Sequence, residues 1–193
     1  MADIDRASPG DAGEILTLQR AAYVTEAQMY GDPFIAPLVE SLEQLRKVIE
    51  TGVVLKAVEG ARIVGSVRGR LPSRALDGGA DAGMGRGMDR GMGGGARRGS
   101  ARRPGHEPGA PGPACVVGRL VVAPDRQGNG IGTALLEALH AAVPEAAAFD
   151  LFTGHLSEGN LRLYRRLGYR ETRRERVQDH LTLIHLRREV APA

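Results

Sequence analysis

Two periodicities of hydrophobic positions alternate along the chain and predict an α/β protein. Short runs of apolar and β-branched residues are typical of strands, and longer segments with an apolar residue every three or four positions are typical of helices. The predicted strands are 4–7, 53–58, 63–71, 115–122, 149–153, 169–177 and 181–186. The predicted helices are 11–30, 41–51, 130–142 and 160–167.

Segment 72–113 interrupts this pattern between the third and fourth strands. It is rich in Gly, Arg, Pro, Ala and Met and has almost no aliphatic residues, so it cannot bury enough apolar surface to offset the entropy lost on ordering. We therefore predict one domain over residues 1–193 with a disordered hairpin insertion at about 72–113. The flanking strands can still pair, because the cost of closing a loop grows slowly with its length.

The net charge of +3 belongs to this insertion, which holds seven Arg against four Asp plus Glu. The rest of the chain is therefore close to neutral. The Arg-Gly repeats are similar to RNA-binding segments, but they lack the aromatic residues that stack on bases. An inert linker is favoured over a nucleic-acid-binding arm.

The remaining composition is that of an ordinary globular protein. The chain starts without a basic leader or an apolar signal segment, and no apolar run approaches the ~20 residues of a membrane span. The single cysteine, Cys115, excludes an internal disulfide and is expected to be a buried strand residue. No Cys/His cluster has metal-ligand spacing. We expect a cytoplasmic protein with no metal and no membrane partner.

One stretch, 121–136, reads V-V-A-P-D-R-Q-G-N-G-I-G-T-A-L-L and joins a strand to a helix through glycines. The N-terminus of a helix has unpaired N–H groups and partial positive charge, and glycines let its backbone approach an anion. A P-loop is excluded because no Lys follows the glycines, and a dinucleotide fingerprint is excluded because Thr133 stands where its third glycine belongs. The pattern Q-x-x-G-x-G at 127–132 remains.

A second motif lies downstream, where strand 149–153 is followed by N-L-R-L-Y-R-R-L-G-Y at 160–169. With both motifs in this order, the chain resembles the GCN5-related N-acetyltransferase (GNAT) family outside the insertion. The resemblance implies a mixed central sheet of about seven strands flanked by four helices, with a V-shaped splay between the fourth and fifth strands. It also implies acetyl-coenzyme A as co-substrate and an amine acceptor in a small molecule or an exposed peptide or protein chain.

The resemblance assigns a coenzyme site to the fourth strand and the glycine loop. The loop would bind the pyrophosphate through backbone amides, and strand amides would bond the pantetheine arm, with one near Val121 facing the carbonyl oxygen. Asn160 matches a position that either bonds the pantetheine or caps the helix, and Arg126 either pairs with a phosphate or is solvated. The predicted coenzyme contacts are Leu120, Val121, Val122, Arg126, Gln127, Gly128, Gly130, Gly132, Thr133 and Asn160.

Tyr164 matches the general acid of the family, because a phenol can protonate a departing thiolate. The base is left open. Many relatives carry a Glu on the fourth strand, but here 117–120 reads V-G-R-L, so Glu26, His155, Glu158 and a water chain remain alternatives. Polar residues that could touch the acceptor are Tyr23, Glu26, Gln28, Tyr30 and Asp32.

Two other functions compete with acetyl transfer. One is a module that binds the coenzyme without turnover, and the other is nucleic-acid binding through the Arg-Gly segment. The sequence does not define the acceptor or the oligomeric state, and a homodimer is compatible with it.

Overall fold

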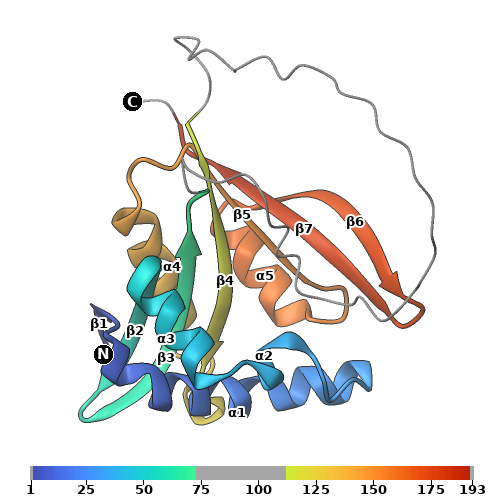
Figure 1. The fold of residues 1–193 in the computed structure, drawn as a ribbon. Coiled ribbons are helices and arrows are strands. Elements are labelled where there is room, and N and C mark those ends of the chain that lie inside the picture. Colours follow the sequence, from blue (N-terminus) through green and yellow to red (C-terminus); the bar gives the residue numbers. More distant parts are fainter. Residues whose placement is uncertain (1, 73–111, 192–193) are drawn as a thin grey trace, which may run out of the picture.

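One mixed sheet organises the molecule. The computed structural model describes residues 2–72 and 112–191, and in them seven strands lie in the order β1-β2-β3-β4-β5-β7-β6 (Figure 1). The strands are β1 (Asp3–Arg6), β2 (Val53–Glu59), β3 (Arg62–Arg70), β4 (Ala114–Val122), β5 (Ala148–Gly154), β6 (Arg170–Gln178) and β7 (Leu181–Glu189). All neighbours are antiparallel except β4 and β5. The predicted α/β class with a seven-stranded mixed sheet is confirmed, whereas the predicted insertion lies almost wholly outside the described residues.

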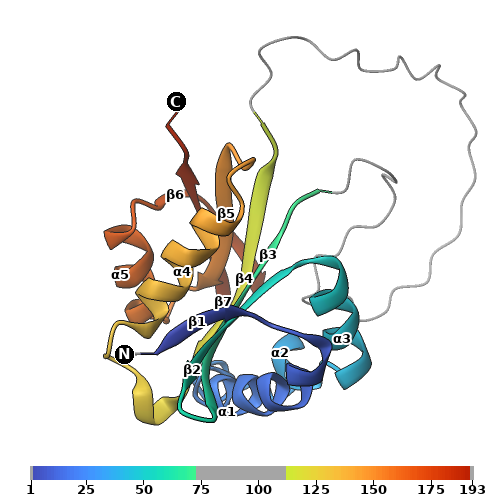
Figure 2. The same cartoon turned by 90° about the vertical axis from the view of Figure 1, so that its left-hand side faces the viewer.

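Helices cover both faces of this sheet (Figure 2). α1 (Ala12–Tyr30) and α3 (Leu42–Thr51) lie on one face, and α4 (Ile131–Ala142) and α5 (Glu158–Arg166) lie on the other. α3 starts with a capping box of the sequence type S-x-x-Q, in which the Gln44 N–H donates to Ser41 Oγ at 3.1 Å and the Ser41 N–H donates to Gln44 Oε1 at 2.8 Å. α1 ends at Gly31, whose φ of 64° favours glycine.

The core lies between these layers. Ile15, Leu45, Leu135 and Leu139 come from the helices and are almost fully buried against the sheet. β3 is buried along nearly its whole length because both of its faces are covered. Cys115 is fully buried, as expected, and burial raises the pKa of its thiol to about 11.

Three local features differ from the sequence prediction. A one-turn helix, α2 (Ala36–Val39), stands in the expected loop before α3. α5 starts at Glu158, two residues before Asn160, with Ser157 as its N-cap. The predicted strand at 169–177 has no buried face, because β6 is an edge strand exposed at all positions except Val177. Charged side chains on such an edge discourage pairing with other chains.

The sheet opens between its two parallel strands. β4 and β5 pair only at three positions, from Ala114↔Ala148 to Val116↔Asp150, and diverge beyond them. In the diverging part of β4, Arg119 and Leu120 together face one residue of β3, because Ser66 pairs with Val121 and Arg68 with Gly118. This bulge bends β4 away from β5, and the predicted V-shaped splay is confirmed.

Candidate active site

The diverging half of β4 presents backbone donors to the splay. The Ala123 N–H donates to Val64 O at 2.8 Å, so Ala123 faces β3. Since donors alternate between the two edges of a strand, the N–H groups of Val122 and Leu120 point toward the splay, and that of Val121 points toward β3. Of the three predicted strand contacts, two therefore lie in position to bond a ligand in the splay. Val121 instead contributes a buried side chain to the core.

The glycine loop follows β4 and leads into α4. Gly128 and Gly130 have φ values of 82° and 79°, a conformation that side chains disfavour. Gly130 is the N-cap of α4 without a side-chain cap, and the Ala134 N–H donates to its carbonyl at 3.0 Å. The amides of Ile131, Gly132 and Thr133 precede this bond and have no acceptor within the helix. The loop thus has the geometry of an anion site.

Gly132 lies in the first turn of α4. A Cβ built at this position would lie 3.4 Å from Leu163 of α5 and 3.7 Å from Val122 of β4. These are ordinary van der Waals distances, so Gly132 lies beside α5 and the end of β4 in a position that would also accommodate a Cβ.

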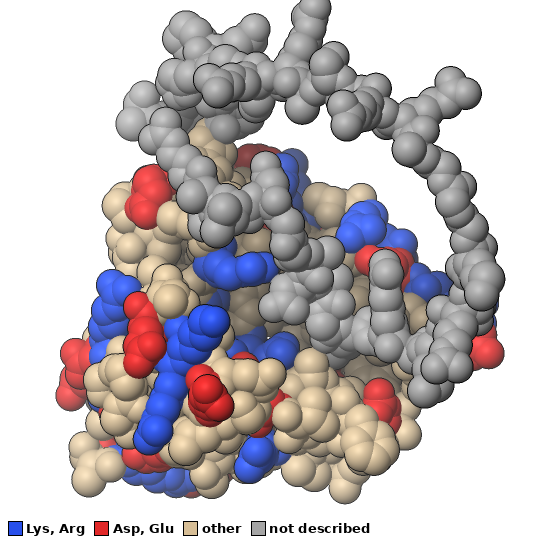
Figure 3. Space-filling view, in the orientation of Figure 1, with Lys and Arg blue, Asp and Glu red and all other residues tan. Residues whose placement is uncertain are grey.

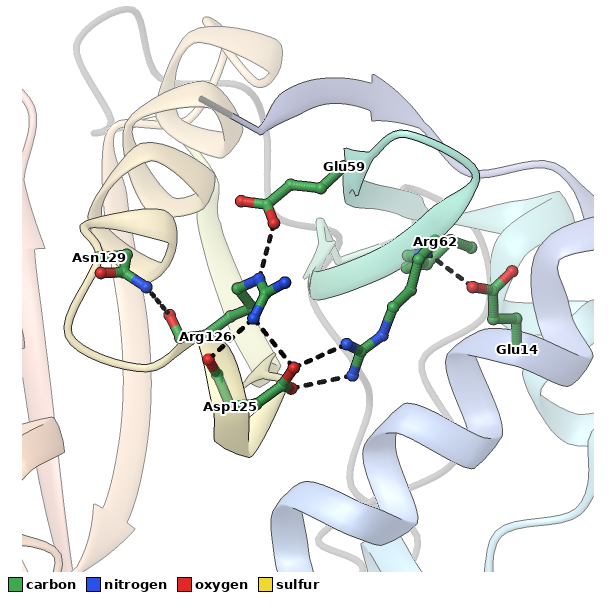
Figure 4. Close-up of polar contacts among 7 residues, drawn as sticks. Glu14, Glu59, Arg62, Asp125, Arg126 and Asn129 are labelled. Atoms are coloured by element: carbon green, nitrogen blue, oxygen red, sulfur yellow. Dashed lines mark hydrogen bonds and ion pairs between the residues drawn. The ribbon is translucent and has the colours of Figure 1, made fainter.

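An ion-pair network braces the turn before this loop (Figure 4). Arg126 Nε donates to Glu59 at 2.8 Å, and its Nη1 lies 3.0 Å from Asp125. Asp125 also accepts a bidentate pair from Arg62 at 2.8 and 2.9 Å. These contacts tie 124–126 to the β2–β3 hairpin. Arg126, a predicted coenzyme contact, thus has its guanidinium engaged with protein carboxylates.

Two further predicted contacts lie near the loop. Gln127 donates from its side-chain amide to Val122 O at 3.4 Å, which links the loop to the end of β4. Asn160 is exposed in the first turn of α5. It does not cap the helix, because Ser157 holds that position, so the capping alternative for Asn160 is excluded and a contact with the pantetheine stays a prediction.

Tyr164 on α5 is buried beneath the site. Its ring packs edge-on against Tyr169, with centroids 5.8 Å apart. Burial raises the pKa of Tyr164 far above its ordinary value, and the nearby Tyr23 and Glu26 add to the rise. The phenol therefore stays protonated at neutral pH, and its raised pKa makes it a weaker acid than an exposed tyrosine.

Glu26 is an acid whose charge acts on both Tyr23 and Tyr164. It is half-buried on α1, and its Oε1 accepts a hydrogen bond from Ser157 Oγ at 3.1 Å. Burial raises the pKa of Glu26, and the hydroxyl of Ser157 and the charge of Arg119 oppose the rise. Burial likewise raises the pKa of the adjacent Tyr23 to about 12. Glu26, Tyr23 and Tyr164 thus share one partly desolvated environment.

The other two side chains considered as bases already contact other groups. Glu158 is 79% exposed and lies 3.2 Å from Arg162 on the surface of α5. His155 Nδ1 accepts the Thr182 N–H at 3.2 Å, which leaves its other nitrogen as the protonated one. Of the three side chains considered, Glu26 alone combines burial with proximity to Tyr164.

The remaining polar residues predicted to touch an acceptor make structural hydrogen bonds or are exposed to solvent. Tyr30 is buried with Leu181 and Leu183, and its hydroxyl accepts the Leu156 N–H at 2.8 Å. Asp32 accepts the Phe34 N–H at 2.8 Å, and Gln28 is exposed.

A buried polar network was missed by the sequence reasoning. Arg68 of β3 donates to both Glu40 oxygens at 2.7 Å and to Gln19 Oε1 at 2.7 Å. Gln19 in turn donates to Pro37 O at 2.8 Å. The network fastens the α2 connection to α1 and β3, next to the splay. Its signal in the sequence is the single charge within the apolar run of β3.

The comparisons with known proteins agree with this geometry. The family model described as "Acetyltransferase (GNAT) domain" matches residues 75–171. The chain belongs to the GNAT acetyltransferase family. No curated protein sequence matches it significantly.

Solved structures with low sequence identity share the fold. The ribosomal-protein-alanine N-acetyltransferase of Brucella melitensis is 17% identical with a TM-score of 0.64, covering 97% of this chain and 99% of that one. YncA of Salmonella typhimurium, solved with its cofactor acetyl-CoA, is 13% identical with a TM-score of 0.63, at 100% and 98% coverage. The PaiA N-acetyltransferase of Thermoplasma acidophilum, in complex with coenzyme A, is 12% identical with a TM-score of 0.63, at 98% and 99% coverage.

None of the described helices combines the length and apolarity that crossing a membrane requires. Within residues 2–72 and 112–191, no group of three or more His, Cys, Asp or Glu side chains could hold a metal ion.

Proposed function

We propose that the protein transfers an acetyl group from acetyl-CoA to an amine by direct attack in a ternary complex. The observation that carries the proposal is the glycine loop, whose free amides at the start of α4 adjoin the splayed end of β4. An anion site next to an unpaired strand edge suits a ligand with a pyrophosphate and an amide-containing arm. Two structures of the same fold were solved with acetyl-CoA or coenzyme A.

The proposed coenzyme contacts follow from the donors described above. The loop amides from Gly128 to Thr133 would bind the pyrophosphate, and the Leu120 and Val122 amides would bond the pantetheine. One of these strand amides would also stabilise the oxyanion that forms at the thioester carbonyl, a contribution of about 3 kcal/mol. Arg126 would contribute by bracing the loop, because it is already paired with Glu59 and Asp125.

Proton transfer completes the proposed reaction. Glu26 takes the proton of the acceptor ammonium, since a raised pKa brings a carboxylate closer to the operating pH of a base. The neutral amine then attacks the thioester carbon, and the carbon–sulfur bond breaks as the amide forms. Tyr164 donates its phenol proton to the departing thiolate and recovers a proton from solvent.

Two measurements test the proposal. Acetyl-CoA should raise the melting temperature, because a ligand that binds only the native state stabilises it, and thiol should be released with a panel of amines. Absence of any thermal shift at millimolar acetyl-CoA would contradict the coenzyme site. A thermal shift without thiol release on any amine would support a non-catalytic coenzyme-binding module instead.

A further inference from the structure

Arg119 occupies an unusual backbone position at the mouth of the splay. Among the described residues it is the one non-glycine residue with a positive φ, at 52°. It is also the bulged residue of β4, directly before Leu120, whose amide faces the splay. A side chain in this conformation costs stability, and such strain concentrates where a bulge directs a side chain toward a functional site.

The Arg119 side chain is partly buried and has no counter-ion among residues 2–72 and 112–191. Its Nε is buried without a hydrogen-bond partner, and no Asp or Glu of residues 2–72 or 112–191 lies within ion-pair distance of it. Its charge nevertheless acts on Tyr23 and Glu26, where it opposes the rise in pKa that burial causes. α1, which carries both Tyr23 and Glu26, packs against β4, and Arg119 is partly buried in β4.

The charge of Arg119 acts on Glu26 and Glu40, and both acids already have other partners. Glu40 accepts both of its hydrogen bonds from Arg68, and this pair is 11% exposed on each side. Glu26 accepts from Ser157. Within residues 2–72 and 112–191, Arg68 is thus paired with a carboxylate and Arg119 is not. A partly desolvated cation of this kind is stabilised by an anion that accepts two hydrogen bonds.

We infer that the acceptor is an aminocarboxylate, such as a free amino acid, whose carboxylate is bound by Arg119. This inference rests on the proposed function. A planar guanidinium matches a carboxylate with two parallel hydrogen bonds. Glu26 and Arg119 then form a pair of opposite charges that fits the ammonium and the carboxylate of one zwitterion. The carboxylate is held one residue from the strand amide that faces the thioester, which places the amine at the reacting carbon.

Matched acceptors test the inference. For several amino acids, kcat/KM is compared with that of the corresponding carboxamide and with that of the decarboxylated amine. The carboxamide keeps the shape of the amino acid but removes its negative charge. We expect the acid to exceed its carboxamide by roughly 10- to 100-fold, the range for a hydrogen bond between charged groups. In Arg119→Gln the ratio of kcat/KM for the acid to that for the carboxamide should fall toward one. In Arg119→Lys this ratio should recover in part, because a lysine keeps the positive charge but lacks the two parallel donors of a guanidinium.

Two controls separate recognition from folding. Arg46→Gln removes an exposed arginine on α3, far from the splay in sequence, and should keep the wild-type ratio. The acetyl-CoA-induced thermal shift of Arg119→Gln should match that of the wild type.

The outcomes are distinct for the two proposals. Acetylation with equal kcat/KM for acids and carboxamides, or an Arg119→Gln variant that retains the wild-type ratio, would overturn the inference and leave the acetyltransferase proposal standing. No acetylation of any amine, with or without a carboxylate, would overturn the proposed function and the inference together.

Discussion

At the residue scale, the environment of a side chain decides its chemistry more than its type does. Glu26 and Glu158 were equal candidates in the sequence, yet one is half-buried beside Tyr164 and the other is solvated on α5. No periodicity in the sequence reports that difference, because it arises where the end of α1 meets the loop after β5.

Glu26→Gln should lower turnover and raise stability at the same time. We expect kcat/KM to fall by roughly 10² to 10⁴, the contribution of a positioned base, and the acidic limb of its pH profile to disappear. The folded-state pKa of Glu26 lies above its unfolded value, so its contribution to stability is present at low pH and is lost as the pH rises through the folded pKa. At pH 7 the neutral Gln avoids that loss, and thermal unfolding should occur at a higher temperature.

Glu50→Gln, on the exposed face of α3, is the control and should change neither quantity. Wild-type turnover in Glu26→Gln would assign the base to another group or to water.

Tyr164→Phe should retain coenzyme binding but lose turnover. The substitution keeps the ring that packs on Tyr169 and removes the proposed proton donor, so kcat should fall by roughly 10² to 10⁴. Tyr169→Phe is the matched comparison, because the Tyr169 hydroxyl lies 2.8 Å from His140 Nε2 in the interior. It should cost about 1 kcal/mol of stability and leave kcat unchanged. Equal kcat for Tyr164→Phe and the wild type would make Tyr164 a packing residue.

At the element scale, local sequence predicted most of the strands, helices and turns that form the candidate site. The order of strands and helices, the capping box at Ser41 and the glycine loop before α4 all follow from short-range rules, because capping and left-handed turns require particular residues. The bulge at Arg119 and the Arg68–Glu40–Gln19 network could not be predicted in this way. They depend on which strands and loops meet across the sheet, over separations of 28 and 49 residues for the Arg68 contacts.

Gly130→Val should abolish coenzyme binding by changing the backbone conformation of the glycine loop. No atom lies within 4 Å of a Cβ at this position, so the substitution is not blocked by space. The φ of 79° is strained for a β-branched residue by about 1–2 kcal/mol, and the loop would relax away from the arrangement that exposes its amides. Isothermal titration with acetyl-CoA measures the loss.

Gly13→Ala provides the glycine control, because its Cβ would also meet open space but α1 is an ordinary helix there. It should raise stability by roughly 0.5–1 kcal/mol and keep the affinity for acetyl-CoA. Unchanged affinity in Gly130→Val would contradict the role of the loop amides.

Glu40→Gln should destabilise the protein strongly, because it leaves the buried Arg68 without its counter-charge. Breaking a buried pair by changing one partner costs roughly 3 kcal/mol, and both side chains here are 11% exposed. Denaturant unfolding measures the change. Glu158→Gln breaks the exposed pair with Arg162 and should leave the midpoint unchanged. A Glu40→Gln midpoint equal to that of the wild type would show that the network does not hold the α2 connection.

At the scale of the whole molecule, side chains of both charges share the surface. On the face in Figure 3, acidic and basic side chains of the described residues are interspersed, as expected for a chain whose excess of Arg lies in 72–113. The charge is not uniform along the described chain, because residues 158–189 carry nine Arg against five Asp plus Glu. This basic region can therefore attract an anionic ligand in addition to the loop amides and Arg119.

Removing residues 73–111 and joining Pro72 to Gly112 with a short turn should leave the fold and the coenzyme site intact. β3 and β4 pair antiparallel as far as Arg70↔Val116, so the two ends to be joined already lie on neighbouring strands, and a tight hairpin can replace the long connection. Shortening a connection of about forty residues to about five should stabilise the protein by up to roughly 2 kcal/mol through a lower closure entropy. Thermal unfolding with and without acetyl-CoA measures both properties. Loss of soluble, cooperatively unfolding protein would show that the segment belongs to the folded domain, whereas loss of RNA affinity alone would support the nucleic-acid-binding arm.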